Sequence, residues 1–322
     1  MIARLQNRWT AMHFIKKLTI LIYIVIVLAG FLVLNHFKPS FFALNNIKNI
    51  LIQGSATGIM TFGMTFVLIT CGMDLSVTPV MSFASVMGAV VMQKTGNAIL
   101  GILAILLTGI LCGSINGISV AQFKMFPFVV TMAMMIIAQA AGTLISNSRT
   151  IPVPQEFIKI ATGTIWGIPI PIFLLFFFAI FFQLLLTKTT FGRGVYAIGI
   201  NPDATTPCGL PSKGILFSAY AISGFTAAVG GIILTAKLGS ASLSTASDSA
   251  TMDVVCAAIL GGVSIYGGTG SIVGPLAGAM FIVAMQNAFN LFGVNYYVAL
   301  IVKGCIILAA TLSDTILAKQ RG

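Results

Sequence analysis

Long apolar runs separated by short polar stretches recur along the whole chain. The hydrocarbon core of a bilayer is about 30 Å thick and takes about 20 helical residues to cross. Apolar runs of about this length lie at 18–37, 50–69, 78–93, 97–119, 126–146, 168–187, 214–236, 253–266, 272–291 and 294–313, with 78–93 and 253–266 the shortest. The pattern predicts an all-α polytopic membrane protein with about ten transmembrane helices.

Two longer polar stretches interrupt this pattern. Residues 147–167 contain Trp166, a residue type enriched where a membrane meets water. Residues 188–213, "KTTFGRGVYAIGINPDATTPCGLPSK", separate spans 2–5 from spans 7–10, with span 6 directly before the stretch. If the spans cross the membrane in alternating directions from a cytoplasmic N-terminus, span 2 runs inward and span 7 runs outward. This order permits an inverted repeat of spans 2–5 and 7–10.

Glycine and serine residues are concentrated in two other stretches. In "LTGILCGSINGIS" (107–119) they lie three or four residues apart, which lets helix backbones approach closely in lipid. The stretch "GGTGSIVGP" (267–275) contains too much glycine for a stable helix centre. The first stretch therefore predicts tight helix packing, and the second predicts a helix break or a cytoplasmic turn.

The composition agrees with a membrane protein. Hydrophobic residues make up 58% of the chain and charged residues only 7%, against about 25% charged residues in soluble domains. A cytoplasmic N-terminus places more Lys and Arg on the inner side than on the outer side, as the positive-inside rule requires. The chain then divides into cytoplasmic tails at 1–17 and 314–322, a transmembrane domain at 18–313 and a cytoplasmic loop at 188–213.

Several function classes are excluded at this level. Chemistry inside a membrane needs converging His, Asp, Glu or Cys side chains, but His13 and His36 both flank the first apolar run and no catalytic motif occurs. We therefore predict no enzyme activity, catalytic residue, metal site or cofactor. The basic residues do not cluster on a soluble face, so no nucleic-acid partner is predicted. No G-x-x-x-x-G-K-[ST] loop is present, so any ATP must be bound by another subunit.

Asp74 lies in "GMDLSVTP" (72–79), between two apolar runs. An ionised Asp in lipid costs about 2.5–3.5 kcal/mol on insertion scales, so such residues normally face protein or water. Two interpretations stay open. Asp74 or Ser76 caps a helix, with Thr78 and Pro79 as the N-cap and first-turn pair of the next one. Alternatively, the stretch is a broken helix whose free backbone groups line a transport path.

Lys303 poses a similar question, because it lies midway along an apolar run. It either extends its ammonium group towards water or pairs within the bundle, or it takes part in conformational coupling. Asp253 is a candidate partner, and it is equally well explained as a first-turn acid favoured by the helix dipole.

Four stretches resemble one family. "GMTFVLITCGMDLSVTP" is similar to the signature G-M-T-x-V-[IL]-x-[ST]-x-G-I-D-L-S-V-G of ribose-type sugar ABC transporter permeases. "INGISVAQFKMFPFVVTMAMM", "FGRGVYAIGINPDATTPCGL" and "MDVVCAAILGGVSIYGGTGSIVGPLAGAM" resemble later stretches of that family in the same order. The chain departs from the family pattern at Thr78–Pro79, Ile200, Thr206 and Thr251.

This resemblance implies the permease subunit of an ABC importer in a bacterial inner membrane. Such a subunit moves a monosaccharide, delivered by a periplasmic binding protein, by alternating access. The implied partners are cytoplasmic ATPase subunits and a second permease copy, most simply in a homodimer. The cytoplasmic motif would couple the chain to the ATPase through Gly192, Arg193, Tyr196, Ala197, Gly199, Asn201, Asp203, Ala204 and Gly209.

A sugar path needs hydroxyl and amide groups without tight binding. The candidates for the path or for conformational change are Thr61, Thr65, Asp74, Ser76, Asn116, Phe128 as an apolar gate, Thr131, Asn287, Asn290 and Lys303. Two alternatives remain. One is a permease of the same family for an autoinducer, a nucleoside or a branched-chain amino acid. The other is an ion-coupled secondary transporter, which would use buried acids such as Asp74 and Asp253.

Overall fold

The computed structural model describes residues 39–201, 209–245 and 248–319. The predicted first span, 18–37, and the N-terminal tail lie outside the described residues. The elements in chain order are η1 (Pro39–Phe42), α2 (Leu44–Ile69), α3 (Val77–Thr95), α4 (Ala98–Ala121), α5 (Pro127–Ser146), β1 (Ile151–Pro152), α6 (Gln155–Thr162), β2 (Thr164–Ile165), β3 (Ile168–Pro169), α7 (Ile170–Lys188), α8 (Thr190–Ile200), α10 (Ser212–Leu238), β4 (Ser240–Ala241), η2 (Leu243–Thr245), α11 (Asp248–Leu260), α12 (Val273–Phe292) and α13 (Tyr296–Lys319).

Six of these helices are long and apolar enough to cross a membrane: α2, α4, α5, α7, α10 and α12. Two shorter apolar helical stretches lie at Ser249–Leu260 and Tyr296–Ile306. The chain is therefore a multi-pass helical membrane protein, but the predicted number of about ten spans is not confirmed. α13 continues to Lys319, so most of the predicted C-terminal tail extends the last helix.

The predicted run 253–266 is wrong as a single span. α11 ends at Leu260, and the chain turns at Gly262, whose φ of 83° lies in the left-handed region that glycine favours. Val263 and Ile265 continue the apolar pattern without continuing the helix. The glycine-rich stretch 267–275 is a break, as predicted, because α12 begins only at Val273.

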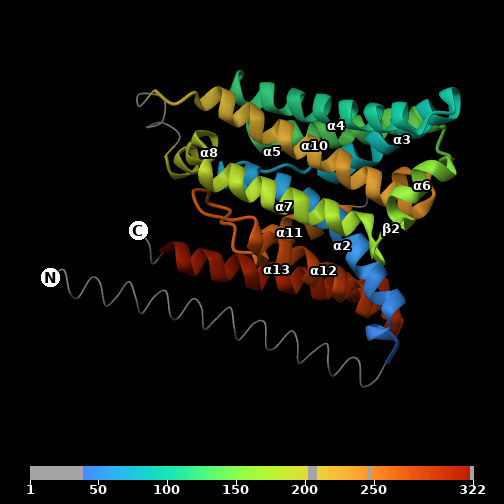
Figure 1. Ribbon diagram of the computed structural model, residues 1–322. Coiled ribbons are helices and arrows are strands. Elements are labelled where there is room, and N and C mark those ends of the chain that lie inside the picture. The colour runs from blue at the N-terminus through green and yellow to red at the C-terminus, as the bar shows by residue number, and fades with distance from the viewer. Residues whose placement is uncertain (1–38, 202–208, 246–247, 320–322) are drawn as a thin grey trace.

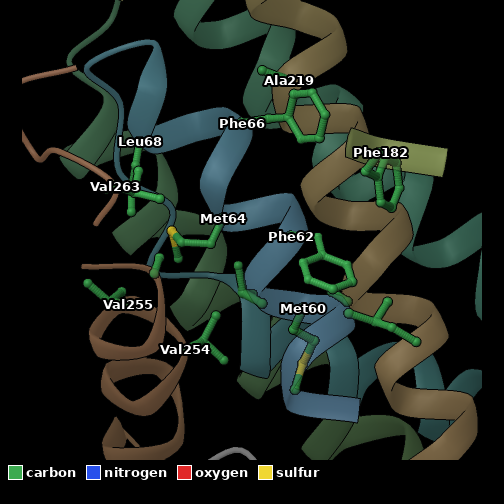
Figure 2. Close-up of a cluster of buried hydrophobic side chains, with 14 of the residues drawn as sticks. Met60, Phe62, Met64, Phe66, Leu68, Phe182, Ala219, Val254, Val255 and Val263 are labelled. Carbon is green, nitrogen blue, oxygen red and sulfur yellow. The ribbon is translucent and has the colours of Figure 1, made fainter. Parts of the chain in front are cut away.

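α2 and α10 form the centre of the bundle and pack along each other in opposite directions (Figure 1). α2 ends beside α8, whereas α10 begins beside α8 and ends beside α6. The contact is close because a methyl group at Gly63 would meet the Ser223 backbone and the Thr226 side chain. Figure 2 shows the α2 side chains Met60, Phe62 and Met64 within the apolar cluster that fills the space around this helix.

The other helices pack on this central pair. α3 and α4 pack on α10 and α5 packs on α3, whereas α11 and α12 pack on α2 and α13 contacts α11. α4 and α10 approach each other through glycine: Gly109 and Gly113 both face Gly224, and a methyl group at any of the three would meet backbone. The tight packing predicted for 107–119 is therefore confirmed.

The two ends of the bundle differ. The paired strands β1–β4 and β2–β3 and the helix α6 lie at one end, and α8 lies at the other (Figure 1). We call these the α6 end and the α8 end. Trp166 lies at the tip of the β2–β3 hairpin and is 93% exposed.

Two helices begin inside the bundle rather than at its ends. After α2, residues 70–76 lead to α3, which packs against β1 and β4 at the α6 end. α11 runs the other way, towards the loop 261–272 at the α8 end. Thr78 and Thr251, in the first turns of α3 and α11, share a hydrogen bond between their buried hydroxyl groups. The starts of these two helices therefore meet in the interior.

Candidate functional site

Asp74 lies in the break between α2 and α3 and is 2% exposed. Its Oδ1 accepts hydrogen bonds from the Ser76 backbone N–H at 2.9 Å and from the Ser76 hydroxyl at 2.6 Å. Its Oδ2 accepts from the Ser223 hydroxyl of α10 at 2.7 Å. Hydrogen bonds from neutral donors satisfy this carboxylate, whose burial would otherwise be costly.

Further polar groups extend this network, which we call the Asp74 network. The Asn116 Nδ2 group of α4 donates to the Ser76 hydroxyl at 2.9 Å. The Thr131 hydroxyl of α5 lies 3.0 Å from the Pro127 carbonyl and 3.3 Å from the Met73 carbonyl. The break is thus held by groups from α4, α5 and α10.

The start of α3 tests the first interpretation of Asp74, in which Asp74 or Ser76 caps a helix. Ser76 stands at the N-cap position of α3, yet its side chain makes no capping bond. Because α3 begins at Val77, both Thr78 and Pro79 lie inside its first turn, so the predicted Thr78 N-cap is wrong. Proline fits there because first-turn N–H groups have no partner within the helix. The segment is a break between two helices that Asp74 helps to hold, and its place along a transport path stays a prediction.

The other candidate path residues lie apart from this network. The hydroxyls of Thr61 and Thr65 are buried and donate to carbonyls of their own helix at 2.7 and 2.8 Å. Asn287 of α12 exchanges hydrogen bonds with Asn46 of α2, at 2.8 and 2.9 Å.

Asn290 and Phe128 lie on the bundle surface. Asn290 is exposed and accepts from Gln286, 3.3 Å away, and Phe128 is exposed at the start of α5. The ten candidates therefore do not form one cluster, and their role in a path stays a prediction.

Lys303 of α13 forms an ion pair with Asp253 of α11, with a distance of 2.8 Å from Nζ to Oδ2. Lys303 is 9% exposed, so its ammonium group pairs within the bundle instead of reaching water. The sequence left Asp253 open as a partner or a first-turn acid, and the structure shows the partner.

The predicted coupling segment contains the helix α8, which has two faces. Arg193 and Asn201 are exposed and Ile200 is 75% exposed, and these residues lie on one side of the helix together with the half-buried Ala197. We call this side the α8 stripe.

The opposite face of α8 is buried against the bundle. Gly192, Gly194 and Gly199 lie there, and a methyl group at Gly192 would meet the backbone of α7. The Tyr196 hydroxyl donates to the Gly270 carbonyl at 2.8 Å, and burial raises the pKa of this hydroxyl above its ordinary value. Gly209 is exposed with a φ of 76°. Asp203 and Ala204 lie outside the described residues.

Sequence reasoning missed several of these residues. Ser223 is separated from Asp74 by 149 residues, and Asn46 from Asn287 by 241 residues. A single serine or asparagine in an apolar helix has no periodic signal that would identify its partner. Within the described part of the chain, no three His, Cys, Asp or Glu side chains gather as metal ligands would.

Comparison with known proteins decides the family. Residues 46–311 match the family described as the branched-chain amino acid transport system permease component. The chain belongs to this permease family. The match runs from the third residue of α2 into α13, and it makes the chain a transport component rather than an enzyme.

The permease has relatives with named substrates. It is 35% identical over 289 residues to the ribose import permease protein RbsC of Haemophilus influenzae, covering 88% of this chain and 89% of that protein. It is 35% identical over 280 residues to RbsC of Bacillus subtilis, covering 86% and 87%. The L-arabinose transport system permease protein AraH of Escherichia coli is 34% identical over 279 residues, covering 86% and 85%. No solved structure matches the chain significantly. The resemblance to ribose-type permeases is confirmed.

Proposed function

We propose that the permease is the membrane subunit of an ABC importer for a monosaccharide. The observation that supports this most strongly is its similarity, over most of both chains, to proteins named for ribose import and L-arabinose transport. A periplasmic protein delivers the sugar, and cytoplasmic ATPase subunits supply the energy, because the permease itself has no phosphate-binding loop.

We propose an orientation with the α8 end in the cytoplasm and the α6 end outside, with both termini cytoplasmic in the bacterial inner membrane. When the predicted spans alternate in direction, more Lys and Arg residues fall on the side that contains α8, and the positive-inside rule assigns this side to the cytoplasm. About ten spans result if 18–37, α3, α11 and α13 cross or enter the membrane in addition to the six long apolar helices. Two copies would enclose one path.

The packing supports an inverted repeat of α2–α5 and α10–α13. α4 packs on α10 and α12 packs on α2, and α3 contacts α10 as α11 contacts α2. In each half a long helix is followed by a break and a helix that begins in the interior. Alternating access would move one half against the other around the α2–α10 pair.

The alternative of an ion-coupled transporter has less support. Both acids that such a transporter would use have structural partners: Asp74 accepts from serine groups, and Asp253 is paired with Lys303. The other alternative, a permease of the same family for an autoinducer or a nucleoside, is tested by offering these solutes as well as sugars in the uptake assay.

The function is tested by purification of the permease from its native host in detergent, followed by reconstitution of the recovered complex into vesicles. We expect an ATPase subunit to co-purify, and ATP together with the periplasmic fraction to drive uptake of labelled ribose or L-arabinose. Recovery of the permease alone, with uptake driven by an ion gradient, would contradict the proposal. ATP-driven uptake of a nucleoside and of neither sugar would replace the substrate class only.

A further inference from the structure

Three segments that are distant in sequence meet at the α8 end. They are the end of α2 with Cys71, the inward face of α8, and the loop 261–272 between α11 and α12. We propose that this junction, through Gly199, Tyr196 and Cys71, transmits movement of α8 to the break between α2 and α3 and to the loop between α11 and α12. The inference rests on the proposed function, and it assigns the three residues a positioning role inside the subunit.

The end of α2 is attached directly to the loop. The Gly268 N–H donates to the Ile69 carbonyl at 2.9 Å, which satisfies one of the carbonyls left free where α2 ends. Cys71 follows with a φ of 59°, an uncommon conformation for a residue with a side chain. Its thiol lies 2.9 Å from the Tyr266 carbonyl. The loop therefore holds the first residues of the break that leads to Asp74.

α8 joins this pair through its own backbone. The Cys71 thiol also lies 3.3 Å from the Gly199 carbonyl, so one sulfur contacts both α8 and the loop. The Tyr196 hydroxyl donates to the Gly270 carbonyl at 2.8 Å. At the far end of the loop, the Ile272 N–H donates to Gln183 Oε1 of α7 at 2.9 Å. Movement of α8 thus acts on the loop before α12 and on the end of α2 together.

At Gly199 the backbones of α8 and of the end of α2 approach each other directly. A methyl group at Gly199 would lie well inside normal contact distance of the Ile69 carbonyl oxygen and the Gly268 nitrogen. A methyl group at Gly267 would meet the Cys71 sulfur, and Gly267 has a φ of 78°. Close-packed backbone is stiff, because small displacements cannot be absorbed by a change of rotamer. The junction is therefore suited to transmit displacement rather than to absorb it.

The exposed side of the same helix is the α8 stripe, with Arg193 and Ile200. α8 would thus receive movement on one face and pass it on through the other. The two receiving segments are the break held by the Asp74 network and the loop that leads into α12, one in each half of the proposed repeat. One movement would then shift both halves at once, which alternating access requires.

The decisive experiment compares two glycine substitutions near the same end of the bundle. Gly199→Ala forces the junction apart. Gly214→Ala is the matched control, because no atom lies within 4 Å of its added methyl position. Each variant is reconstituted as the full complex with its ATPase subunits and periplasmic protein. The readout is uptake per ATP hydrolysed, with ribose or L-arabinose, whichever the wild-type complex transports.

We expect G199A to retain ATP hydrolysis and the ATPase subunit while its uptake per ATP falls at least tenfold, and G214A to match the wild type. Tyr196→Phe keeps the ring and removes one neutral hydrogen bond. It should lower the same ratio by about threefold, in line with the net effect of one such bond. This milder variant also tests the junction if G199A does not fold.

Two results would overturn the inference. Uptake per ATP at the wild-type value in Y196F, and in G199A if it folds, would show that the junction does not transmit movement. A parallel loss of ATP hydrolysis and uptake, in proportion to the protein recovered, would show a purely structural role. If the wild-type permease recruits no ATPase subunit, the proposed function itself is wrong. This failure is distinguishable from failure of the inference, because it is seen with the wild-type protein before any variant is compared.

Discussion

Asp74 and Lys303 are both ionisable residues buried in the helix bundle, but their partners differ. Among the described residues, Asp74 accepts from two serine side chains and one backbone N–H and forms no ion pair. Lys303 has a direct counter-ion in Asp253. Removal of one partner therefore has a different consequence in each case, and each case gives a prediction.

Ser223→Ala should destabilise the permease by about 1–3 kcal/mol, because it leaves Oδ2 of the buried Asp74 carboxylate without its donor. The measurement is the thermal unfolding midpoint of the protein in detergent. Ser218→Ala is the control, since Ser218 lies on the same helix, is partly exposed and donates to the Gly214 carbonyl of its own helix. Equal midpoints for the two variants would contradict the role given to the Asp74 network.

Lys303→Met should destabilise the permease by about 1–3 kcal/mol, because it leaves the partly buried Asp253 carboxylate without its counter-ion. The double variant K303M/D253L removes both charges and should be closer to the wild type. Both are compared by unfolding in detergent. A double variant at least as unstable as K303M would show that the ion pair itself stabilises the contact of α13 with α11.

Among the elements, the long apolar helices could be predicted well from the sequence. The predicted runs 97–119, 126–146 and 272–291 correspond to α4, α5 and α12 within a few residues. Such runs end at polar residues, glycine or proline, and these boundaries are local. The end of α11 could not be predicted in this way, because apolar residues continue past Gly261 and Gly262 into a loop.

The candidate site was less predictable than the helices. The motif in α8 indicated the coupling segment, but not that Gly199 faces α2 while Ile200 faces outward. The motif around Asp74 indicated a break, but not the donor on α10. These properties depend on which segments meet in three dimensions, and a single sequence contains no local pattern for such a contact.

The α8 stripe gives the prediction at the level of one element. Arg193→Glu and Ile200→Asp should each weaken recovery of the ATPase subunit by about tenfold or more, since few residues dominate such an interface. Pull-down of the tagged permease measures the subunit ratio. Lys159→Glu is the control, because it reverses the same charge on an exposed residue of α6, at the opposite end. Unchanged recovery in both α8 variants would place the ATPase contact elsewhere.

For the whole molecule, the orientation is the property to test. The variant Lys159→Cys, on α6, should react with a membrane-impermeant maleimide in spheroplasts, because the α6 end is expected outside. The variant Lys213→Cys, at the start of α10, should react with the maleimide only after the membrane is permeabilised. Both positions are exposed, and the parent protein gives the background from its natural cysteines. The reverse pattern would invert the proposed topology.

The ion pair between α11 and α13 also bears on how the chain is made. Asp253 is synthesised before Lys303, and the two are 50 residues apart. At about 5–20 residues per second, the acid waits about 3–10 seconds for its counter-ion. During this time α11 cannot take its final place without burying an unpaired charge. Assembly of the second half should therefore depend on insertion of α13, and chains that stall before Lys303 should be preferred substrates of membrane proteases.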